Sequence, residues 1–447
     1  MTSSERFEND AREAGTATVS AKEVRKIALA AFVGTALEWY DYFLFGTAAA
    51  LVFNRIYFTT LDPAAATLAA FATFGVGFAA RPIGAILFGF IGDRAGRRPA
   101  LLMTIVLIGV GTGLIGLLPD FNTIGIAAPV MLVVLRLVQG LAVGGEWGGA
   151  MTLAVEHSPV EKRGRFAALV QVGSPIGTLM SSGGIALVLL LPPASFDAWG
   201  WRLPFLAAFP LVLIALYIRL KVEESPIFKE IVRLEQRAKI PAVAVFKEAW
   251  GRLIVAVAAA MLGVGGFYVM TTFVISYGTT TLGLDRGLMV NATVVAGVVE
   301  IGILLIGGQI CERFGPGRTM MWGGIAAAIG AFPVFWLIDT RNPIGVILGV
   351  TVGVALVSIA YAVTGALLTE LFPPKLRYSG VSLGYNLAGA LSGFLPLVAV
   401  AFLGMSGGAS WTAAIIFIAL GLITAAGGLF GERLRVKDQT LMAVEFG

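Results

Sequence analysis

Ionisable side chains stand inside stretches of this sequence that are otherwise apolar. Glu38 and Asp41 lie in the first long apolar stretch, Arg81 in the second and Arg136 in the fourth. A carboxylate can take up and release a proton, and a guanidinium can hold a carboxylate through two parallel hydrogen bonds. These residue types therefore suit proton transfer and the binding of an anion, without a covalent step.

Residue types for covalent or metal chemistry are scarce. The chain has one histidine, His157, and one cysteine, Cys311, and it contains no Gly-Lys-Ser/Thr phosphate-binding loop. One residue of each type permits neither an internal disulfide nor a His-rich metal site. We therefore expect that the protein is not an enzyme and that it binds no metal and no cofactor.

The composition indicates what surrounds these charges. Of the 447 residues, 57% are hydrophobic and only 13% are charged, whereas soluble domains carry about 25% charged residues. The 57 glycines follow no Gly-X-Y period and suit helices that pack closely inside a membrane. A soluble globular protein is excluded, and so is a disordered chain, which needs low hydrophobicity and high charge.

Apolar runs long enough to cross a bilayer recur along the chain, since about 20 mainly apolar residues span the hydrocarbon core. We predict twelve transmembrane helices, which is an all-α integral membrane fold. Their approximate ranges are 27–53, 65–91, 100–118, 124–155, 166–191, 202–220, 252–277, 288–310, 319–338, 344–369, 379–403 and 411–430. The first run is too long for the apolar region of a signal peptide, so we expect no cleaved leader.

The basic residues indicate the orientation, because positive charge gathers on the cytoplasmic side of membrane proteins. Of the 32 Lys and Arg residues, those outside the inner segments are Arg55, Arg202, Arg286 and Arg341 in outer loops and Arg81 and Arg136 in spans. We therefore expect both termini in the cytoplasm. The net charge of +5 is then explained by the inner loops and needs no nucleic acid.

Two sequence patterns recur in the second half of the chain. GFIGDRAGRR, from Gly89, corresponds to GQICERFGPGR, from Gly308, and EHSPVEKRGR, from Glu156, corresponds to ELFPPKLRYSG, from Glu370. We expect two pseudo-symmetric six-helix bundles, the arrangement of a transporter whose site lies between its halves. The predicted division is a cytoplasmic tail at 1–26, bundles at 27–220 and 252–430, a cytoplasmic linker at 221–251 and a cytoplasmic tail at 431–447.

Several motifs resemble those of one transporter family. GFIGDRAGRR resembles the signature loop of the major facilitator superfamily, and RLVQGLAVGGEWGGA, from Arg136, resembles its fourth-span motif. Five further pieces look like its metabolite:proton symporter branch, which includes permeases for shikimate, alpha-ketoglutarate and proline or betaine; they are ALEWYDYFLFGTAAALVF, RPIGAILFG, GGEWGGA, WGWRLPF and EESPIF. The resemblance implies a monomeric symporter in the lipid bilayer of a bacterial inner membrane, which imports a small organic acid with protons by alternating access.

Other functions stay open on the sequence alone. A zwitterionic osmolyte of the proline or betaine type is the nearest alternative substrate, although osmosensing carriers of that kind have a long C-terminal extension. A sugar carrier and a drug/proton antiporter are further alternatives. A channel would predict a charged or carbonyl-lined pore, usually built by several subunits, and a duplicated single chain favours a carrier.

The resemblance places proton coupling on Asp41, with Arg136 as its partner and Glu38 on the same helix face. With both acids ionised, Arg81 and Arg136 are balanced, and protonation of one acid frees a guanidinium for an anionic substrate. Structural alternatives stay open for each residue: a purely structural pair of Asp41 and Arg136, a neighbouring span as the partner of Glu38, and backbone carbonyls near Pro82 as the partners of Arg81.

Further polar residues are candidates for substrate binding and for gating. The substrate candidates are Arg81, Arg136, Tyr42, Gln139, Gln171, Tyr268, Tyr361, Asn386 and Glu300, of which Glu300 stands equally for a packing network. The gating candidates are Asp93, Arg94, Arg97, Glu146, Glu156, Arg163, Glu312 and Arg313. By resemblance, Asp93 latches the inner side against the eleventh span. We expect Glu146 and Glu156 to stabilise that gate with Arg163 or Arg165.

Overall fold

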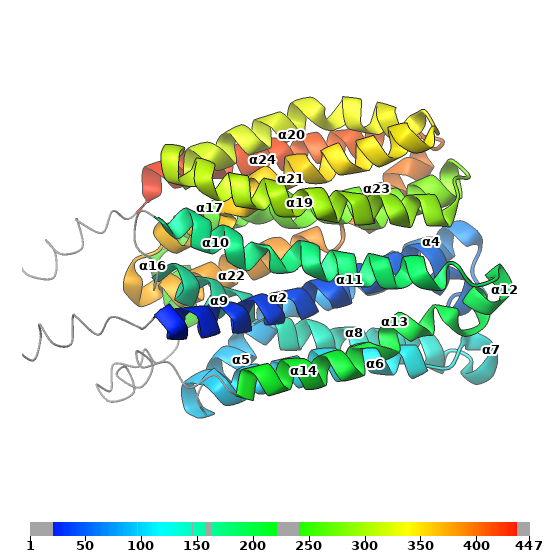
Figure 1. Cartoon of the computed structure of the whole chain (residues 1–447), viewed down its shortest axis with the longest axis horizontal. Coiled ribbons are helices and arrows are strands. Elements are labelled where there is room, and N and C mark those ends of the chain that lie inside the picture. Colours follow the sequence, from blue (N-terminus) through cyan, green and yellow to red (C-terminus); the bar gives the residue numbers. More distant parts are fainter. Residues whose placement is uncertain (1–20, 96, 145, 157–161, 221–240, 436–447) are drawn as a thin grey trace, which may run out of the picture.

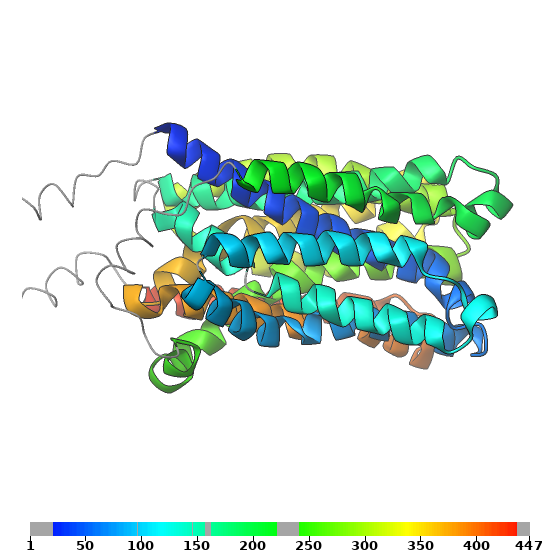
Figure 2. The same cartoon turned by 90° about the horizontal axis from the view of Figure 1, so that it is seen from below.

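The computed structural model describes residues 21–95, 97–144, 146–156, 162–220 and 241–435, with the backbone alone at 21–31, 219 and 241–244 and in parts of 89–101, 149–156 and 374–378. Within these residues all regular structure is helical. The predicted all-α class is confirmed. The helices run side by side along the long axis of the molecule in both views (Figures 1 and 2).

The helices before residue 221 form the first bundle, and several of the predicted spans consist of two consecutive helices. They are α2 (Ala21–Ala48) with η1 (Ala49–Phe53) and α3 (Asn54–Ile56), α4 (Pro63–Ala79) with α5 (Arg81–Ala95), α6 (Arg97–Leu117), α7 (Phe121–Ile124), α8 (Ala127–Val143) with α9 (Glu146–Glu156), α10 (Arg163–Gln171) with α11 (Gly173–Val188), and α12 (Pro193–Ser195), η3 (Phe196–Gly200), α13 (Arg202–Leu206) and α14 (Ala208–Leu220). The helical stretch that contains the sixth predicted span, 202–220, begins earlier, at Pro193.

The helices after residue 240 form the second bundle. They are α16 (Pro241–Glu248), α17 (Trp250–Met261) with η4 (Leu262–Gly266), η5 (Val269–Phe273), α18 (Val274–Ser276) and η6 (Tyr277–Thr281), then α19 (Arg286–Phe314), α20 (Pro316–Asp339), α21 (Pro343–Leu371), α22 (Pro374–Ser392) with α23 (Leu395–Met405), and α24 (Trp411–Leu434). The described residues contain nine helical stretches that are long and apolar enough to cross a membrane.

Local sequence explains where several helices begin. The Asp62 side chain accepts hydrogen bonds from the amides of Ala64 and Ala65 at 3.1 Å, and Pro63 follows it at the first helical position. Asn342 with Pro343 begins α21 in the same way. An Asx cap followed by proline satisfies free amide groups and presets the helical backbone, so these loops return the chain sharply into the next span.

Helix α20 shows how the bundle meets lipid on one side and protein on the other. Trp322, Ile329 and Trp336, spaced seven residues apart, are 63%, 74% and 64% exposed, an apolar stripe that suits hydrocarbon and not water. On the inner face, a Cβ at Gly324 would lie 2.7 Å from the amide nitrogen of Ala425 on α24. Glycine therefore allows these two helices their close approach.

The two bundles contact each other along their length. In Figure 1, α19, α20, α21 and α24 lie above, and α5, α6, α8 and α14 lie below. Helices α10 and α11 of the first bundle pack against α19, and α22 of the second bundle packs against α4, α5 and α9. We call the end where α2 begins and α24 ends the terminal face, and the opposite end, which carries α7 and α12, the distal face (Figure 1).

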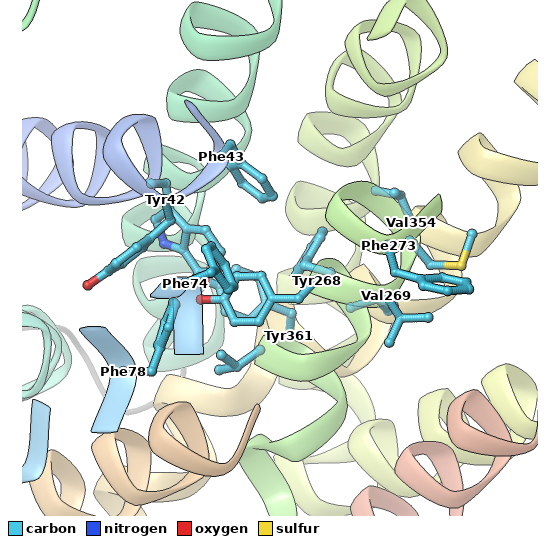
Figure 3. Packing of buried hydrophobic residues seen from close by; sticks show 14 of the residues in the cluster. Tyr42, Phe43, Phe74, Phe78, Tyr268, Val269, Phe273, Val354 and Tyr361 are labelled. Atoms are coloured by element: carbon cyan, nitrogen blue, oxygen red, sulfur yellow. The ribbon is translucent and has the colours of Figure 1, made fainter. Parts of the chain in front are cut away.

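Aromatic rings from both bundles meet at the centre (Figure 3). Tyr268 of the second bundle lies with its ring centroid 5.2 Å from Phe74 and 4.9 Å from Phe78 of the first. The ring of Trp39 on α2 lies 5.8 Å from Tyr361 on α21. The centre of the molecule is therefore filled by side chains, and these rings must part before a solute can enter.

Candidate functional site

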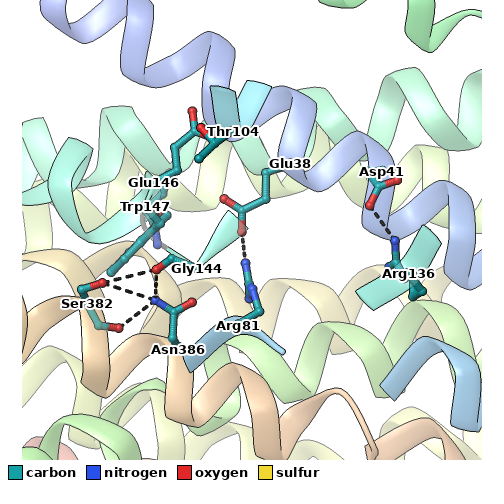
Figure 4. A network of polar contacts seen from close by, with 11 residues as sticks. Glu38, Asp41, Arg81, Thr104, Arg136, Gly144, Glu146, Trp147, Ser382 and Asn386 are labelled. Atoms are coloured by element: carbon teal, nitrogen blue, oxygen red, sulfur yellow. Dashed lines mark hydrogen bonds and ion pairs between the residues drawn. The ribbon is translucent and has the colours of Figure 1, made fainter. Parts of the chain in front are cut away.

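Asp41 and Arg136 form a buried ion pair inside the first bundle (Figure 4). The guanidinium of Arg136 donates through Nη1 to Asp41 Oδ2 at 2.6 Å. Gln139 Nε2 and the Thr112 hydroxyl each donate to Asp41 Oδ1 at 2.6 Å. Both oxygens of a carboxylate that is only 1% exposed thus have partners, which is what a buried charge requires.

Small residues on neighbouring helices make room for these long side chains. A Cβ at Gly77 on α4 would lie 2.9 Å from Cγ of Arg136, and a Cβ at Gly111 on α6 would lie 2.8 Å from Cγ of Gln139. Arg136 and Gln139 follow each other by one turn on α8 and therefore point the same way. The site is formed by α2, α4, α6 and α8, and at these two glycines the helices pack too closely for a larger residue.

The rest of the Arg136 guanidinium faces aromatic rings and has hydrogen-bonding capacity to spare. Its central carbon lies 4.1 Å from the ring centroid of Phe45, 5.3 Å from that of Tyr42 and 5.6 Å from that of Phe74. Such contacts stabilise a buried cation. Among the described residues, Nε and Nη2 of Arg136 have no hydrogen-bond partner, so this edge can receive the carboxylate of a ligand.

A second buried pair lies beside the first. Arg81 donates through Nη2 to Glu38 Oε1 (Figure 4), and both side chains are 1% exposed. The guanidinium of Arg81 lies 4.8 Å from the ring centroid of Tyr42. Arg136 approaches the same ring, so both guanidiniums contact Tyr42. Oε2 of Glu38 and Nε of Arg81 have no partner within the described part of the chain.

The structure brings the predicted acids and guanidiniums together as two separate pairs. Glu38 and Asp41 occupy the same helix three residues apart, yet each contacts a different arginine. The predicted charge balance of two acids against two guanidiniums is thus matched by the geometry. Whether these residues carry protons or bind substrate stays a prediction.

Phenol groups from both bundles face this region. The hydroxyls of Tyr42 and Tyr268 are buried, and neither has a hydrogen-bond partner among the residues that the structure describes. Tyr361, the third tyrosine predicted to bind substrate, packs edge-on against Phe267 at 5.3 Å. These rings fill the region between the bundles and combine apolar surface with a few polar groups, which is the usual make-up of a small-molecule site.

Gln171 and Asn386 lie nearer the terminal face and contact across the two bundles. Gln171 Nε2 donates to the carbonyl of Tyr361 at 3.3 Å and its Oε1 accepts from Trp147 at 3.1 Å. Asn386 Nδ2 donates to the carbonyl of Gly144 at 2.6 Å (Figure 4). In this closed arrangement both amides hold the bundles together and are not turned towards the ion pairs.

Glu300 is not part of the central cluster. It lies on α19, is 1% exposed, and accepts a hydrogen bond from the Ser174 hydroxyl of α11 at 3.4 Å. The structure thus places this predicted substrate residue at the interface between α11 and α19, to one side of the ion pairs.

The terminal face is held by a contact that the sequence did not specify. Arg165 of the first bundle pairs with the predicted gating residue Glu312 of the second at 2.8 Å. Next to it, Cys311 is 4% exposed, and a Cβ at Gly164 would lie 2.9 Å from its Cβ. Helix α10 thus contributes to covering the single cysteine of the chain, which lies on α19. Arg313 lies over the neighbouring Phe314, 5.3 Å from its ring centroid.

Several predicted gating residues lie outside the described side chains. They are Asp93, Arg94, Arg97 and Glu156. Glu146 is described: it is 3% exposed, and its Oε2 accepts from Thr104 of the same bundle at 3.4 Å. Arg163 begins α10 and is half-buried. Arg165 pairs with Glu312, while the expected pairing of Glu146 and Glu156 with Arg163 or Arg165 stays a prediction.

The distal face carries a charged cluster that the sequence reasoning missed. Asp197 on η3 accepts two hydrogen bonds of 2.9 Å from Arg55 of the same bundle and one of 3.2 Å from Arg286 of the other. The available signal was that Asp197, Arg55 and Arg286 all fall in predicted outer loops, although they are far apart in the sequence. The bundles are thus bridged by charged pairs at both faces, which agrees with the closed centre.

Comparisons with known proteins agree with the predicted family. The family model described as Major Facilitator Superfamily matches residues 31–396. The shikimate transporter of Escherichia coli (strain K12) is 37% identical over 417 residues, covering 92% of this chain and 94% of that protein. The proline/betaine transporter of the same strain is 33% identical over 391 residues, covering 84% of this chain and 77% of its own. A crystal structure of a D-xylose-proton symporter has a TM-score of 0.69 at 20% identity and covers 92% of this chain and 98% of its own, a likeness of fold.

Proposed function

The chain belongs to the Major Facilitator Superfamily, and we propose that it is a proton-coupled symporter that imports a small organic acid across the bacterial inner membrane by alternating access. It is a transporter and not an enzyme, with several membrane-spanning helices. The proposal concerns the substrate, the proton and the direction. It needs no cofactor, because the proton gradient supplies the free energy, and it needs only a monomer.

The spare edge of the Arg136 guanidinium is the observation that carries the proposal. Nε and Nη2 of Arg136 are buried without a partner in the described residues, and a planar guanidinium binds a carboxylate through two parallel hydrogen bonds. The hydroxyls of Tyr42 and Tyr268 lie in the same region and suit the hydroxyls of a polar acid. The similarity to a shikimate transporter favours the same substrate class.

Asp41 is the proposed proton carrier. When Asp41 is ionised, its charge neutralises Arg136, and an incoming anion gains little. When Asp41 takes up a proton, Gln139 and Thr112 still hold its side chain in place, while the charge of Arg136 becomes available to the substrate. Proton and anion binding thus favour each other, and by linkage each raises the affinity for the other equally.

We assign the terminal face to the cytoplasm, because the predicted inner loops carry nearly all the basic residues. The central aromatic rings then separate an outer from an inner approach to Arg136. Release of the proton on the more alkaline inner side would restore the pair of Asp41 and Arg136 and expel the anion. This order gives import.

The experiment uses purified protein in liposomes with radiolabelled shikimate as the probe. Asp41→Asn should abolish uptake driven by a pH gradient while keeping counterflow, in which labelled and unlabelled probe exchange without net proton movement. Glu38→Gln is the matched control on the same helix face. Intact driven uptake by Asp41→Asn would remove Asp41 from the role, and loss of driven uptake in Glu38→Gln alone would assign it to Glu38.

A zwitterionic substrate is the second candidate, because aromatic rings at the centre suit a quaternary ammonium group and because of the similarity to a proline/betaine transporter. Labelled proline and betaine should be tested in the same liposomes. Accumulation of these two probes without any accumulation of shikimate would reject the organic acid.

A further inference from the structure

The two central ion pairs leave different hydrogen-bonding groups available. Both carboxylate oxygens of Asp41 have partners, and the atoms of that pair without a partner in the described residues are donors, Nε and Nη2 of Arg136. Glu38 and Arg81 are joined from Nη2 to Oε1, which leaves one acceptor, Oε2 of Glu38, and one donor, Nε of Arg81. The first pair therefore suits a carboxylate, and the second suits a group that both donates and accepts.

A hydroxyl group matches the second combination, because it donates one hydrogen bond and accepts others. Oε2 of Glu38 shares a carbon with the bonded Oε1, and Nε of Arg81 shares a carbon with the bonded Nη2. One hydroxyl, or two neighbouring hydroxyls of one molecule, can therefore satisfy both spare atoms. An ionised carboxylate cannot donate, and a quaternary ammonium group can neither donate nor accept.

Burial makes this match selective. The side chains of Glu38 and Arg81 are each 1% exposed, and a buried polar atom that is left without a partner costs free energy. A substrate that satisfies Oε2 and Nε is therefore favoured over one that covers these atoms without bonding them. A site built to bond a hydroxyl rejects an analogue that lacks it for the same reason.

The pair of Glu38 and Arg81 lies at the boundary between the bundles. A Cβ at Gly389 on α22 would lie 2.9 Å from Nη1 of Arg81, so the second bundle covers this side chain in the closed arrangement. The guanidinium carbons of Arg81 and Arg136 lie 4.8 Å and 5.3 Å from the centroid of the Tyr42 ring. Once the central rings part, one small molecule can meet Arg136 with its carboxylate and the second pair with its hydroxyls.

We propose that the pair of Glu38 and Arg81 is a hydroxyl-binding subsite that selects hydroxylated carboxylic acids, with Glu38 as the acceptor and Arg81 as the donor. This inference rests on the proposed function and narrows its substrate class. It requires no proton movement at Glu38, which accepts the hydroxyl as a carboxylate while its contact with Arg81 stays in place. Proton coupling remains with Asp41.

Competition in counterflow tests the selection without a proton gradient. Liposomes that contain the protein exchange radiolabelled shikimate at equal pH on both sides, and the competitors are unlabelled shikimate, its cyclohexene carboxylate analogue without hydroxyls, and betaine. Wild-type protein should bind shikimate at least about tenfold more tightly than either of the other two, the least expected for the loss of a hydrogen bond to a charged group. This comparison needs no variant and so does not depend on how a variant folds.

Glu38→Gln tests the assignment to this pair. Glutamine keeps the length of the side chain and one oxygen for Arg81, but it replaces the charged acceptor by an amide nitrogen, which donates. The preference for shikimate over the analogue without hydroxyls should fall at least about fivefold. Asp41→Asn is the matched control on the same helix, and it should change both affinities alike, because both acids carry the carboxylate that meets Arg136.

The outcomes separate this inference from the proposed function. Equal competition by all three compounds in the wild-type protein would overturn the hydroxyl subsite and leave the import of an organic acid in place. An unchanged preference in Glu38→Gln, or an equal loss of preference in Asp41→Asn, would overturn the assignment to Glu38 and Arg81. If the wild-type protein does not exchange labelled shikimate, the proposed substrate is rejected and this inference with it.

Discussion

The pair of Asp41 and Arg136 should behave as one energetic unit in the stability of the protein. Asp41→Asn keeps an oxygen that can accept from Gln139 and Thr112, so the main loss is the counter-charge of a buried guanidinium. Breaking one side of a buried pair costs about 3–5 kcal/mol. The aromatic contacts of Arg136 are the same in both proteins and do not change this difference.

Arg136→Met produces the opposite defect, a buried carboxylate that keeps two neutral donors. It should lower the free energy of unfolding by about 3–5 kcal/mol as well. The double variant contains no charge at this place, and replacement of a whole buried pair is often neutral or stabilising. We therefore expect the double variant to lose about 2 kcal/mol or less. Because the two single losses total at least about 6 kcal/mol, the interaction energy between the two positions should then be at least about 4 kcal/mol.

The assay is equilibrium unfolding in mixed micelles with increasing SDS, followed by tryptophan fluorescence for the wild type, both single variants and the double variant. The partly exposed pair of Arg55 and Asp197 is the matched control, and its cycle with the same substitutions should give about 1 kcal/mol or less. Additivity of Asp41→Asn and Arg136→Met within about 0.5 kcal/mol would refute the reasoning. It would mean that Asp41 is already neutral in the closed protein.

The remaining predictions use the rate at which a membrane-permeant maleimide labels the buried Cys311. Gly148→Ala places a Cβ 2.7 Å from Cα of Ser382 on the other bundle, which should open the terminal face and speed labelling severalfold; an unchanged rate would contradict the contact. Arg165→Gln removes the pair with Glu312 at the same face and should speed labelling about two- to fivefold, the range for an exposed pair. Arg286→Gln removes the bridge between the bundles at the distal face, so labelling should slow by at most about fivefold, and the difference should vanish in high salt. Faster labelling in Arg286→Gln would show that the distal bridge does not favour closure on that side.

Much of the fold was predictable because it follows from quantities that add along the chain. Apolar runs and the Asx-Pro turns at Asp62 and Asn342 are local properties, and a bilayer leaves helices as the main way to satisfy backbone groups. The boundaries were less predictable. The helical stretch that contains the sixth predicted span begins at Pro193, because η3 continues the helix through residues that lie between the predicted fifth and sixth spans.

The sequence by itself determined which ionisable groups must avoid lipid. Exposure of a charged side chain to hydrocarbon has a high free-energy cost, whatever the rotation of its helix, and this applies to Glu38, Asp41, Arg81, Arg136 and Glu300. Only the tertiary structure decided how they are satisfied. Two acids three residues apart on α2 contact different arginines, while Glu300 meets only a serine hydroxyl. These pairings depend on helix rotation and on close approaches at glycines such as Gly77. Such approaches are set by packing between segments that are far apart in the sequence, so no local sequence pattern predicts them.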